Sequence, residues 1–353
     1  MSEKITAKLR AAVRFLRVFA KWLVIASVTG AAGGLIGAAF HLSVDGANGL
    51  RASFPWLLWL LPAIGVLIAL IYRYTHLESE GTNAVIDSIH LGERIPLALV
   101  PVIFASTVLT HLCGGSAGRE GAALQIGGGL GWSLGRLFRL DDKDMRLATL
   151  CGMSALFSAL FGTPLTAAIF ALEVISVGVV YYSGLVPCLT AALAAYGVTR
   201  LFDVPPTAFA VAAPGLSAGL LWRVAVLGVA CAAMSIAFCV VMHRGEHYIA
   251  KALKNPYLRA AAGGFAIIGL TFLCGTTDYN GAGMELIERA IERGEAEPAA
   301  FALKLVFTAG TLGCGLCRPS SSARRLAACL GRCSAYLRAL PPRWASSPSS
   351  AGR

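Results

Sequence analysis

The sequence predicts an all-α polytopic membrane protein with broken, tilted helices, and three observations support this prediction. Apolar residues make up 56% of the 353 residues and charged residues only 14%, a balance typical of membrane proteins rather than of water-soluble domains. Long uncharged stretches recur along the chain, and glycine clusters interrupt them. None of the stretches alternates polar with apolar residues, as the strands of a membrane β-barrel do.

Eight uncharged stretches are candidate membrane helices. Each has at least 18 residues, and about 20 residues of helix cross the roughly 30 Å hydrocarbon core of a bilayer. In chain order they are 22–44, 52–72, 95–118, 147–172, 174–199, 204–222, 224–243 and 260–277.

Residues 1–18 form a basic segment ahead of the first apolar stretch. Lys and Arg outnumber its one acid, Glu3, and such flanks stay in the cytoplasm. We therefore expect a multi-pass protein of the bacterial inner membrane with a cytoplasmic N-terminus and no cleaved signal peptide. A topology anchor is the simpler interpretation of the basic segment, and recognition of lipid headgroups is the alternative.

The net charge of +11 does not indicate a nucleic-acid partner. Seven of the positive charges lie in residues 314–353, which contain no acid, and the rest of the chain carries +4. That remainder suits the positive loops of a membrane protein. The ten cysteines show no zinc-ligand grouping, and the pair Cys314 and Cys317 has no partner pair at zinc spacing. We expect no metal, no cofactor and no enzymatic activity.

One charged pair, Arg119 and Glu120, lies between two long apolar stretches and among glycines. These glycines are Gly114, Gly115, Gly118, Gly121, Gly127, Gly128 and Gly129. A charged pair at membrane depth is costly unless it is paired or lines a watery path, so it marks a candidate functional site. Glycines before a helix let the backbone turn and leave N–H groups pointing out of the helix N-terminus, where anions bind.

Glu120 stands where such an anion would pass. Its ionised carboxylate would compete with the anion for the same N–H groups, and its protonated form would release them and carry a proton. This is a minimal mechanism of anion/proton exchange. The alternative is that Glu120 only forms an ion pair with Arg119 or another cation.

A second glycine break lies at Gly81, directly before Thr82, Asn83 and the short apolar run 84–91. The threonine hydroxyl and the asparagine amide could contact an ion, or they could cap a helix. Helix capping is the simpler interpretation of these residues taken alone.

Both breaks recur at an offset of 200 residues. Residues 81–87 are echoed by 281–287, and residues 112–115 are echoed by 312–315. Paired halves with glycine-interrupted helices are typical of inverted-repeat transporters, whose site lies where the halves meet.

Two motifs resemble those of the CLC family of chloride channels and antiporters. Gly118-Arg119-Glu120-Gly121-Ala122 resembles the family motif GREGP, and the segment 161–173 resembles the proline-containing helix that follows it. The resemblance covers residues 13–315. It implies a CLC-type inverted repeat, with the first half at 19–200, a partial second half at 201–315, and a homodimer.

Two departures place the resemblance closest to the fluoride-exporting branch. The motif GSGIP of the chloride proteins is replaced by Gly81-Thr82-Asn83-Ala84-Val85, which is similar to the fluoride-branch stretch GNNLIIDEIH, and Val174 stands where chloride/proton antiporters carry a glutamate. The resemblance implies fluoride/proton antiport with Glu120 as gate and proton carrier. It also implies anion contacts from Thr82, Asn83, Gly118, Arg119 and Gly121, and structural roles near the site for Pro164 and Glu173.

Residues 316–353 differ from the rest of the chain. They are rich in Arg, Ser, Ala and Pro, contain no acid, and lack the motifs that the repeat predicts after Gly315. We interpret this tail as the product of a frameshift near the codons of Gly315, which would leave the second half incomplete and the chain inactive. A genuine disordered basic tail is the alternative.

Other functional classes are less well supported. A CLC-type chloride channel or chloride transporter is the main alternative, because the gate glutamate is common to both. An intramembrane serine protease around Ser116 is a distant one, because no matching histidine segment is present.

Overall fold

The computed structural model describes residues 2–77, 82–91, 94–174, 181–207, 209, 217–295, 297 and 299–315. Within these ranges the description excludes the side chains of residues 2–5, 7, 9, 11, 82–84, 87 and 91. The residues of the basic tail, 316–353, lie outside the described part.

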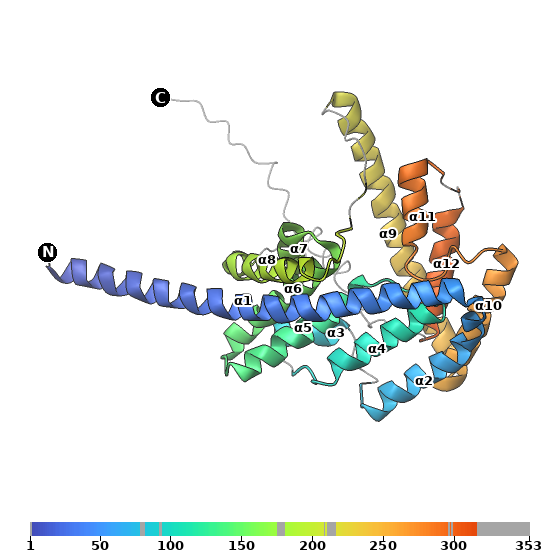
Figure 1. The fold of residues 1–353 in the computed structure, drawn as a ribbon, viewed down its shortest axis with the longest axis horizontal. Helices are drawn as coiled ribbons and strands as arrows, with labels where there is room; N and C mark the ends of the chain where they lie inside the picture. Colours follow the sequence, from blue (N-terminus) through green and yellow to red (C-terminus); the bar gives the residue numbers. More distant parts are fainter. Residues whose placement is uncertain are drawn as a thin grey trace, which may run out of the picture.

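Helices are the regular secondary structure of the described residues, as predicted (Figure 1). Their order is α1 (Ser2–Ser53), the 3-10 helix η1 (Pro55–Leu60), α2 (Leu61–Tyr74), α3 (Thr82–Leu91), α4 (Leu99–Leu112), α5 (Glu120–Leu137), α6 (Asp142–Phe161), α7 (Pro164–Glu173), the 3-10 helix η2 (Tyr182–Gly184), α8 (Leu185–Arg200), α9 (Ala218–Ala252), α10 (Pro256–Cys274), α11 (Met284–Glu288), the π-helical turn η3 (Arg289–Arg293) and α12 (Ala300–Gly313).

Six helical segments of the described chain are long and apolar enough to cross a membrane. They are Ala12–Ser53, Pro55–Tyr74, Asp142–Phe161, Tyr182–Arg200, Ala218–Ala252 and Pro256–Cys274. Three further apolar helices, α4, α7 and α12, have 10 to 14 residues and are too short to cross at 1.5 Å per residue. The fold therefore combines full spans with half-length helices.

Two of the stretches predicted as single spans are broken. The stretch 95–118 holds only α4, which ends at Leu112 because Gly114 takes a left-handed conformation with a φ of +78°. The stretch 147–172 divides into α6 and α7 at Gly162, which has a φ of +70° and is followed by Pro164 at the start of α7.

A third predicted span, 204–222, is wrong. Residues 204–207 are not helical, and α9 begins only at Ala218, where the Ser217 side chain caps it. The physical reason lies in Pro205 and Pro206, which lack the N–H group that a helix interior requires.

The tightest packing joins α5 to α6. A Cβ atom on Gly127 would collide with the backbone around Gly152, and a Cβ atom on Gly131 would collide with the carbonyl of Ala148. The two helices can approach this closely only because these positions are glycine. Around them the main core gathers buried residues of α1, α5, α6 and α8, for example Phe40, Ile126, Leu156 and Cys188.

The short helices are arranged as the predicted repeat requires. Helices α4 and α12 both have 14 residues, and left-handed glycines, Gly114 and Gly315, follow their C-termini. Helix α3 begins at Thr82, and its counterpart α11 begins at Met284 after the left-handed Gly283. The boundaries predicted at residues 18, 200 and 315 remain predictions.

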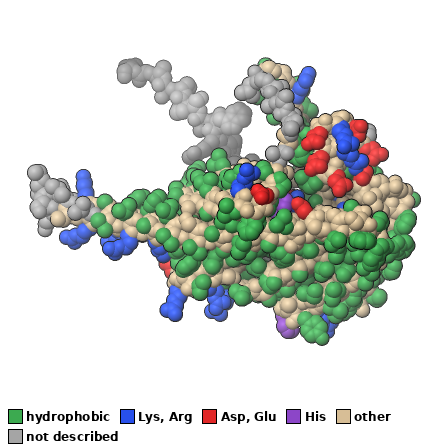
Figure 2. Space-filling model, in the orientation of Figure 1, with side chains coloured by type: hydrophobic (Ala, Val, Ile, Leu, Met, Phe, Trp, Pro, Cys, Tyr) green, Lys and Arg blue, Asp and Glu red, His purple; other side chains and the backbone are tan. Residues whose placement is uncertain are grey.

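Helix α9 joins the rest of the described structure mainly through α12. It has no buried residue, and its N-terminal part projects beyond the other helices (Figure 1). Near its C-terminal part, Ile249 lies against Gly313 of α12. Apolar side chains cover much of the visible surface, as expected for a protein that faces lipid (Figure 2).

Candidate functional site

The charged pair lies where an irregular segment enters α5. Residues 115–118 form neither a helix nor a turn. Arg119 occupies the N-cap position of α5, and Glu120 is the first residue of the helix. No side chain caps this end. The first N–H groups of a helix lack intrahelical acceptors, and the helix dipole adds positive potential there. The start of α5 is therefore a favourable place for an anion or a carboxylate.

The Glu120 side chain folds back over the segment that precedes it. Its Oε2 atom lies beside Gly118, so closely that a Cβ atom at that position would collide with it. Gly121, in contrast, faces open space, with no neighbouring atom within 4 Å of the position of a Cβ atom. Glu120 is exposed, and among the described residues it takes part in no ion pair.

Arg119 pairs with α1 rather than with Glu120. Its Nη1 atom donates to Oδ1 of Asp45 at 3.3 Å, and Oδ2 of Asp45 lies 2.8 Å from Nε2 of His41. Arg119 is buried, whereas about half of the Asp45 side chain is exposed. The alternative in which Glu120 serves only as the ion-pair partner of Arg119 is thus not what the structure shows.

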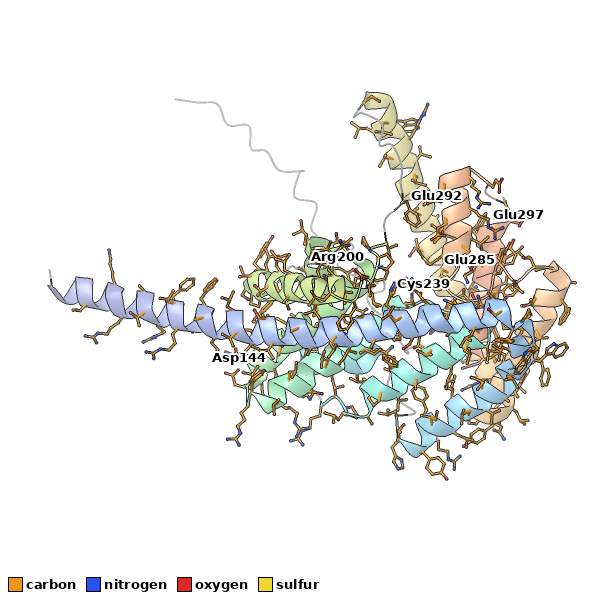
Figure 3. All side chains as sticks on the ribbon, in the orientation of Figure 1. Asp144, Arg200, Cys239, Glu285, Glu292 and Glu297 are labelled. Atoms are coloured by element: carbon orange, nitrogen blue, oxygen red, sulfur yellow. The ribbon has the colours of Figure 1, made fainter. Side chains whose placement is uncertain are left out.

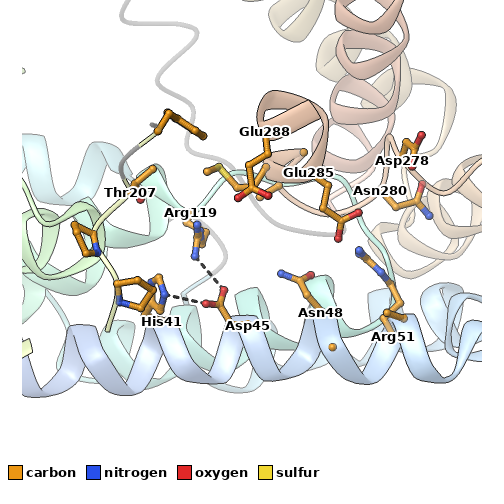
Figure 4. Close-up of a pocket in the computed structure, with 18 residues that line it drawn as sticks. His41, Asp45, Asn48, Arg51, Arg119, Thr207, Asp278, Asn280, Glu285 and Glu288 are labelled. Carbon is orange, nitrogen blue, oxygen red and sulfur yellow. Dashed lines mark hydrogen bonds and ion pairs between the residues drawn. The ribbon is translucent and has the colours of Figure 1, made fainter. Parts of the chain in front are cut away.

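A cavity of about 550 Å³ opens beside this ion pair (Figure 4). His41, Asp45 and Arg119 line one part of it, and Arg51 and Asn280 line another. The remaining lining residues are Asn48, Gly49, Ala52, Pro205, Pro206, Thr207, Phe209, Asp278, Ala282, Gly283, Met284, Glu285 and Glu288.

The cavity carries more negative than positive charge. Asp45, Asp278, Glu285 and Glu288 contribute carboxylates, and only Arg51 and Arg119 contribute guanidinium groups. Asp278 is paired with Arg289 outside the lining, at 2.7 Å. Glu292 and Glu297 extend the acidic surface on the neighbouring segment (Figures 2 and 3). Such a surface raises the local concentration of protons and cations.

Helix α12 holds the segment that leads to Glu120. The Nζ atom of Lys304 donates to Oγ of Ser116 at 2.8 Å and to the carbonyl oxygens of Tyr279 at 3.0 Å and Gly281 at 2.6 Å. The backbone N–H of Ser116 donates to Oγ1 of Thr311 at 3.0 Å. These bonds join the start of α5, the loop after α10 and α12.

Tyr279, in the loop after α10, is anchored at both ends. Its carbonyl accepts from Lys304, and its hydroxyl donates to Oε2 of Glu297 at 2.6 Å. This hydrogen bond, together with burial, raises the pKa of Tyr279 to about 12. The loop that lines the cavity is thereby held in place from two sides.

The other predicted site residues lie at helix ends. Thr82 and Asn83 begin α3, but their side chains lie outside the described part, so their contacts with an anion remain predictions. Val85 of α3 packs against Gly128, which brings the start of α3 close to α5. Pro164 begins α7 and Glu173 ends it, with Glu173 exposed.

The sequence interpretation missed four polar residues of this region. His41 and Asp45 are spaced by four residues at the end of the first apolar stretch, a spacing that predicts one helix face. Lys304 is a lone charge within an apolar run, which would have marked it as a candidate. No comparable sequence pattern marks Arg51 as a candidate site residue.

These features define a class: a polytopic helical membrane protein that combines full spans with half-length helices and carries a carboxylate at a helix N-terminus preceded by glycine. A family model described as "Voltage gated chloride channel" matches residues 64–317. The chain belongs to this family.

Relatives of known name include both fluoride and chloride proteins. A "Chloride/fluoride channel protein" of Pseudomonas syringae pv. tomato is 34% identical over 311 residues, covering 85% of this chain and 68% of the relative. An "H(+)/Cl(-) exchange transporter ClcA" of Cronobacter sakazakii is 31% identical over 167 residues, covering 43% of this chain and 36% of the relative.

Solved structures share the fold. The crystal structure of a CLC-type fluoride/proton antiporter matches with a TM-score of 0.80 and 28% identity, covering 92% of this chain and 83% of that protein. A slow cyanobacterial Cl⁻/H⁺ antiporter matches with a TM-score of 0.65 and 18% identity, covering 90% and 81%, which shows the fold alone.

Proposed function

We propose that this protein exports fluoride in exchange for protons and that Glu120 is both the gate and the proton carrier. One observation carries the proposal: the Glu120 carboxylate lies at the start of α5, folded over Gly118, while Arg119 is engaged by Asp45. Glu120 is therefore available for exchange with an anion. Family membership supports anion transport as the general function.

The mechanism follows from the two protonation states of Glu120. When ionised, the carboxylate competes with the anion for the N–H groups at the start of α5. When protonated, it loses the negative charge that those groups attract, and the anion takes its place. Each cycle then moves a proton one way and an anion the other. The acidic cavity is lined by Arg119, the neighbour of Glu120 in the sequence, and its carboxylates raise the local proton concentration, which supports a supply of protons from that side.

Fluoride is the proposed anion because of the sequence at the start of α3. The Thr82-Asn83 pair is where the fluoride branch departs from the chloride proteins, and helix α3 packs against α5 through Val85. A relative named for both chloride and fluoride and the solved structure of a fluoride/proton antiporter support the same assignment.

Chloride transport is the second candidate. The observation that favours it is the 31% identity to an H⁺/Cl⁻ exchange transporter, although that match covers less than half of this chain. A passive channel and an exchanger share the same carboxylate, so proton movement has to be measured to separate them.

The protease alternative is disfavoured by the surroundings of Ser116. The contact between Ser116 Oγ and Lys304 Nζ has the composition of a Ser-Lys dyad. Ser116 is fully buried, however, and Lys304 uses its other hydrogens on two carbonyl groups. A lysine that donates all three hydrogens cannot accept the serine proton. We therefore retain the expectation of a transporter without enzymatic activity.

The homodimer, the cytoplasmic N-terminus and the frameshift in residues 316–353 remain proposals from the sequence. Blue-native electrophoresis, labelling of the N-terminus from each side of the membrane, and resequencing around the codons of Gly315 test them in turn. An in-frame reading through the tail in an independent clone would refute the frameshift.

The ion assignment is tested in proteoliposomes that contain either the chain with residues 316–353 as they stand or an in-frame version, in which the reading frame is restored after Gly315. The in-frame version serves for all other transport measurements. Fluoride and chloride efflux are recorded with selective electrodes, and proton movement is followed with a pH dye. From the in-frame version we expect fluoride efflux coupled to proton uptake and much slower chloride efflux. From the chain with the present tail we expect neither, and transport by that chain would contradict the frameshift. Chloride efflux at an equal rate would remove the fluoride assignment, and efflux without proton movement would indicate a channel.

A further inference from the structure

The first helix is much longer than a membrane is thick. Helix α1 has 52 residues, which span about 78 Å at 1.5 Å per residue, whereas the hydrocarbon core of a bilayer is about 30 Å thick. Its uncharged part covers only residues 22–44. Its N-terminal part extends well past the other helices (Figure 1).

An ion pair marks the level at which α1 leaves the helix bundle. The Nζ atom of Lys21 lies 2.5 Å from Oδ2 of Asp144, in the first turn of α6 (Figure 3). Helix α6 is itself a candidate span, so its charged first turn lies at a membrane surface. Residues 2–20 of α1 therefore lie at or beyond that surface.

This segment carries a stripe of basic side chains, which we call the basic stripe: Arg10, Arg14, Arg17 and Lys21. Their spacing of four, three and four residues places them along one face of the helix. All four residues are exposed. The one acid among residues 2–21 is Glu3, so nothing within the segment neutralises the stripe.

The other side of the segment is apolar, and we call it the apolar face: Phe15, Leu16, Val18 and Phe19. Phe15 is 73% exposed and Leu16 is 66% exposed. The rings of Phe15 and Phe19 stack with their centroids 6.4 Å apart. Apolar surface of this extent is unfavourable in water, and no described helix covers it.

We propose that residues 10–21 bind an anionic lipid surface, with the basic stripe on the headgroup phosphates and the apolar face at the boundary of the acyl chains. A helix with one basic and one apolar face binds at this boundary. Charge complementarity selects anionic lipids, since clusters of Lys and Arg next to a span are attracted to them. The Lys21–Asp144 pair places the C-terminal end of the segment at the level of the headgroups.

The turn between α5 and α6 adds to the same surface. Arg136 and Arg139 are exposed there, a few residues from Asp144, and basic side chains are visible along both the free part of α1 and the adjoining edge of the bundle (Figure 2). This inference concerns membrane attachment and does not depend on which anion the protein transports.

The test is amide hydrogen exchange of the full chain in lipid nanodiscs. One preparation contains phosphatidylcholine alone, and the other contains a mixture with phosphatidylglycerol. We expect the amides of residues 6–20 to exchange several-fold more slowly in the mixture, with the difference disappearing at high salt because exposed charges are screened.

Two single substitutions with the same loss of charge make the test specific. Arg14→Gln, on the basic stripe, should reduce the lipid-dependent protection about fivefold, which corresponds to about 1 kcal/mol per basic residue near an anionic surface. Lys8→Gln, on an exposed residue outside the stripe, should leave it nearly unchanged. Any of three results would overturn the proposal. The first is equal exchange in the two lipids, and the second is an equal effect of the two substitutions. The third is protection that rises with protein concentration in phosphatidylcholine alone. The last outcome would indicate a second copy of the chain as the partner.

Discussion

Gly118 leaves open the space that the Glu120 carboxylate fills at the start of α5. At the residue scale, this pair is the part of the site that the sequence specifies most directly. In this conformation the Glu120 carboxylate occupies the place where a side chain at position 118 would begin. The motif Gly118-Arg119-Glu120 thus supplies both the carboxylate of Glu120 and, at Gly118, the space in which it lies.

Replacing Gly118 with Ala should displace the Glu120 carboxylate, because the added Cβ atom would collide with Oε2. We expect proton movement per fluoride ion to fall several-fold while fluoride efflux continues, since the gate is moved but not neutralised. Gly121→Ala is the matched control, because its Cβ atom would meet nothing. Paired fluoride and proton flux recordings check this, and equal coupling in both variants would contradict the assigned geometry.

Asn83→Ala tests the second predicted contact. If the amide of Asn83 contacts the anion, its removal should lower the preference for fluoride over chloride by about tenfold, since a hydrogen bond to a charged group contributes about 1.5–3 kcal/mol. The ratio of the two efflux rates is the measurement. Unchanged selectivity would show that Asn83 does not contact the anion and only lies at the start of α3.

At the scale of the elements, close contacts between helices depend on glycine. Gly131→Ala on α5 would push a Cβ atom into the carbonyl of Ala148 on α6, and we expect a loss of about 1–3 kcal/mol of stability from overpacking. Gly269→Ala, at an open position within α10, should be neutral or stabilising, because alanine favours helix more than glycine does. Thermal unfolding in detergent compares the two, and equal midpoints would argue against this packing.

Lys304 links α12 to the segment before Glu120. Lys304→Met would remove three donors and leave two loop carbonyls and Ser116 without this partner. We expect a loss of about 2 kcal/mol of stability and slower fluoride efflux, whereas Lys251→Met on the exposed surface of α9 should change neither. Thermal unfolding and efflux of both variants are the readouts. Normal efflux in Lys304→Met would show that the link is dispensable.

The elements also show where sequence interpretation reaches its limit. The length of the uncharged stretches predicted that α1, α6, α9 and α10 contain spans. An uncharged apolar helix is stable in lipid if it is long enough to cross the hydrocarbon core. Uncharged length did not locate the end of α4 or the break between α6 and α7, because a left-handed glycine ends a helix without any change in hydropathy. Around residues 205 and 206 the absence of charge was misleading, because the two prolines there cannot lie in a helix interior.

For the whole molecule, the repeat and the family were predictable because they depend on short motifs with fixed spacing. The pairing of Arg119 with Asp45, which also contacts His41, was not, because Asp45 and His41 lie 74 and 78 positions away from Arg119 in the chain and only the packing of α1 brings them together. The cavity could not be predicted from the sequence either, since its walls come from four separated segments. The charge of such a cavity cannot be derived from composition, because the chain as a whole is basic.

The whole-molecule account depends on one claim: a single carboxylate couples the anion to the proton. The most direct measurement is proton uptake driven by a fluoride gradient in proteoliposomes containing the in-frame version of the chain, either with Glu120 or with Glu120→Gln. Glutamine has a similar shape to the protonated gate but cannot exchange a proton. We expect fluoride-driven proton uptake in the in-frame version with Glu120 and none in the variant, and proton uptake that persists in Glu120→Gln would contradict the role of this carboxylate.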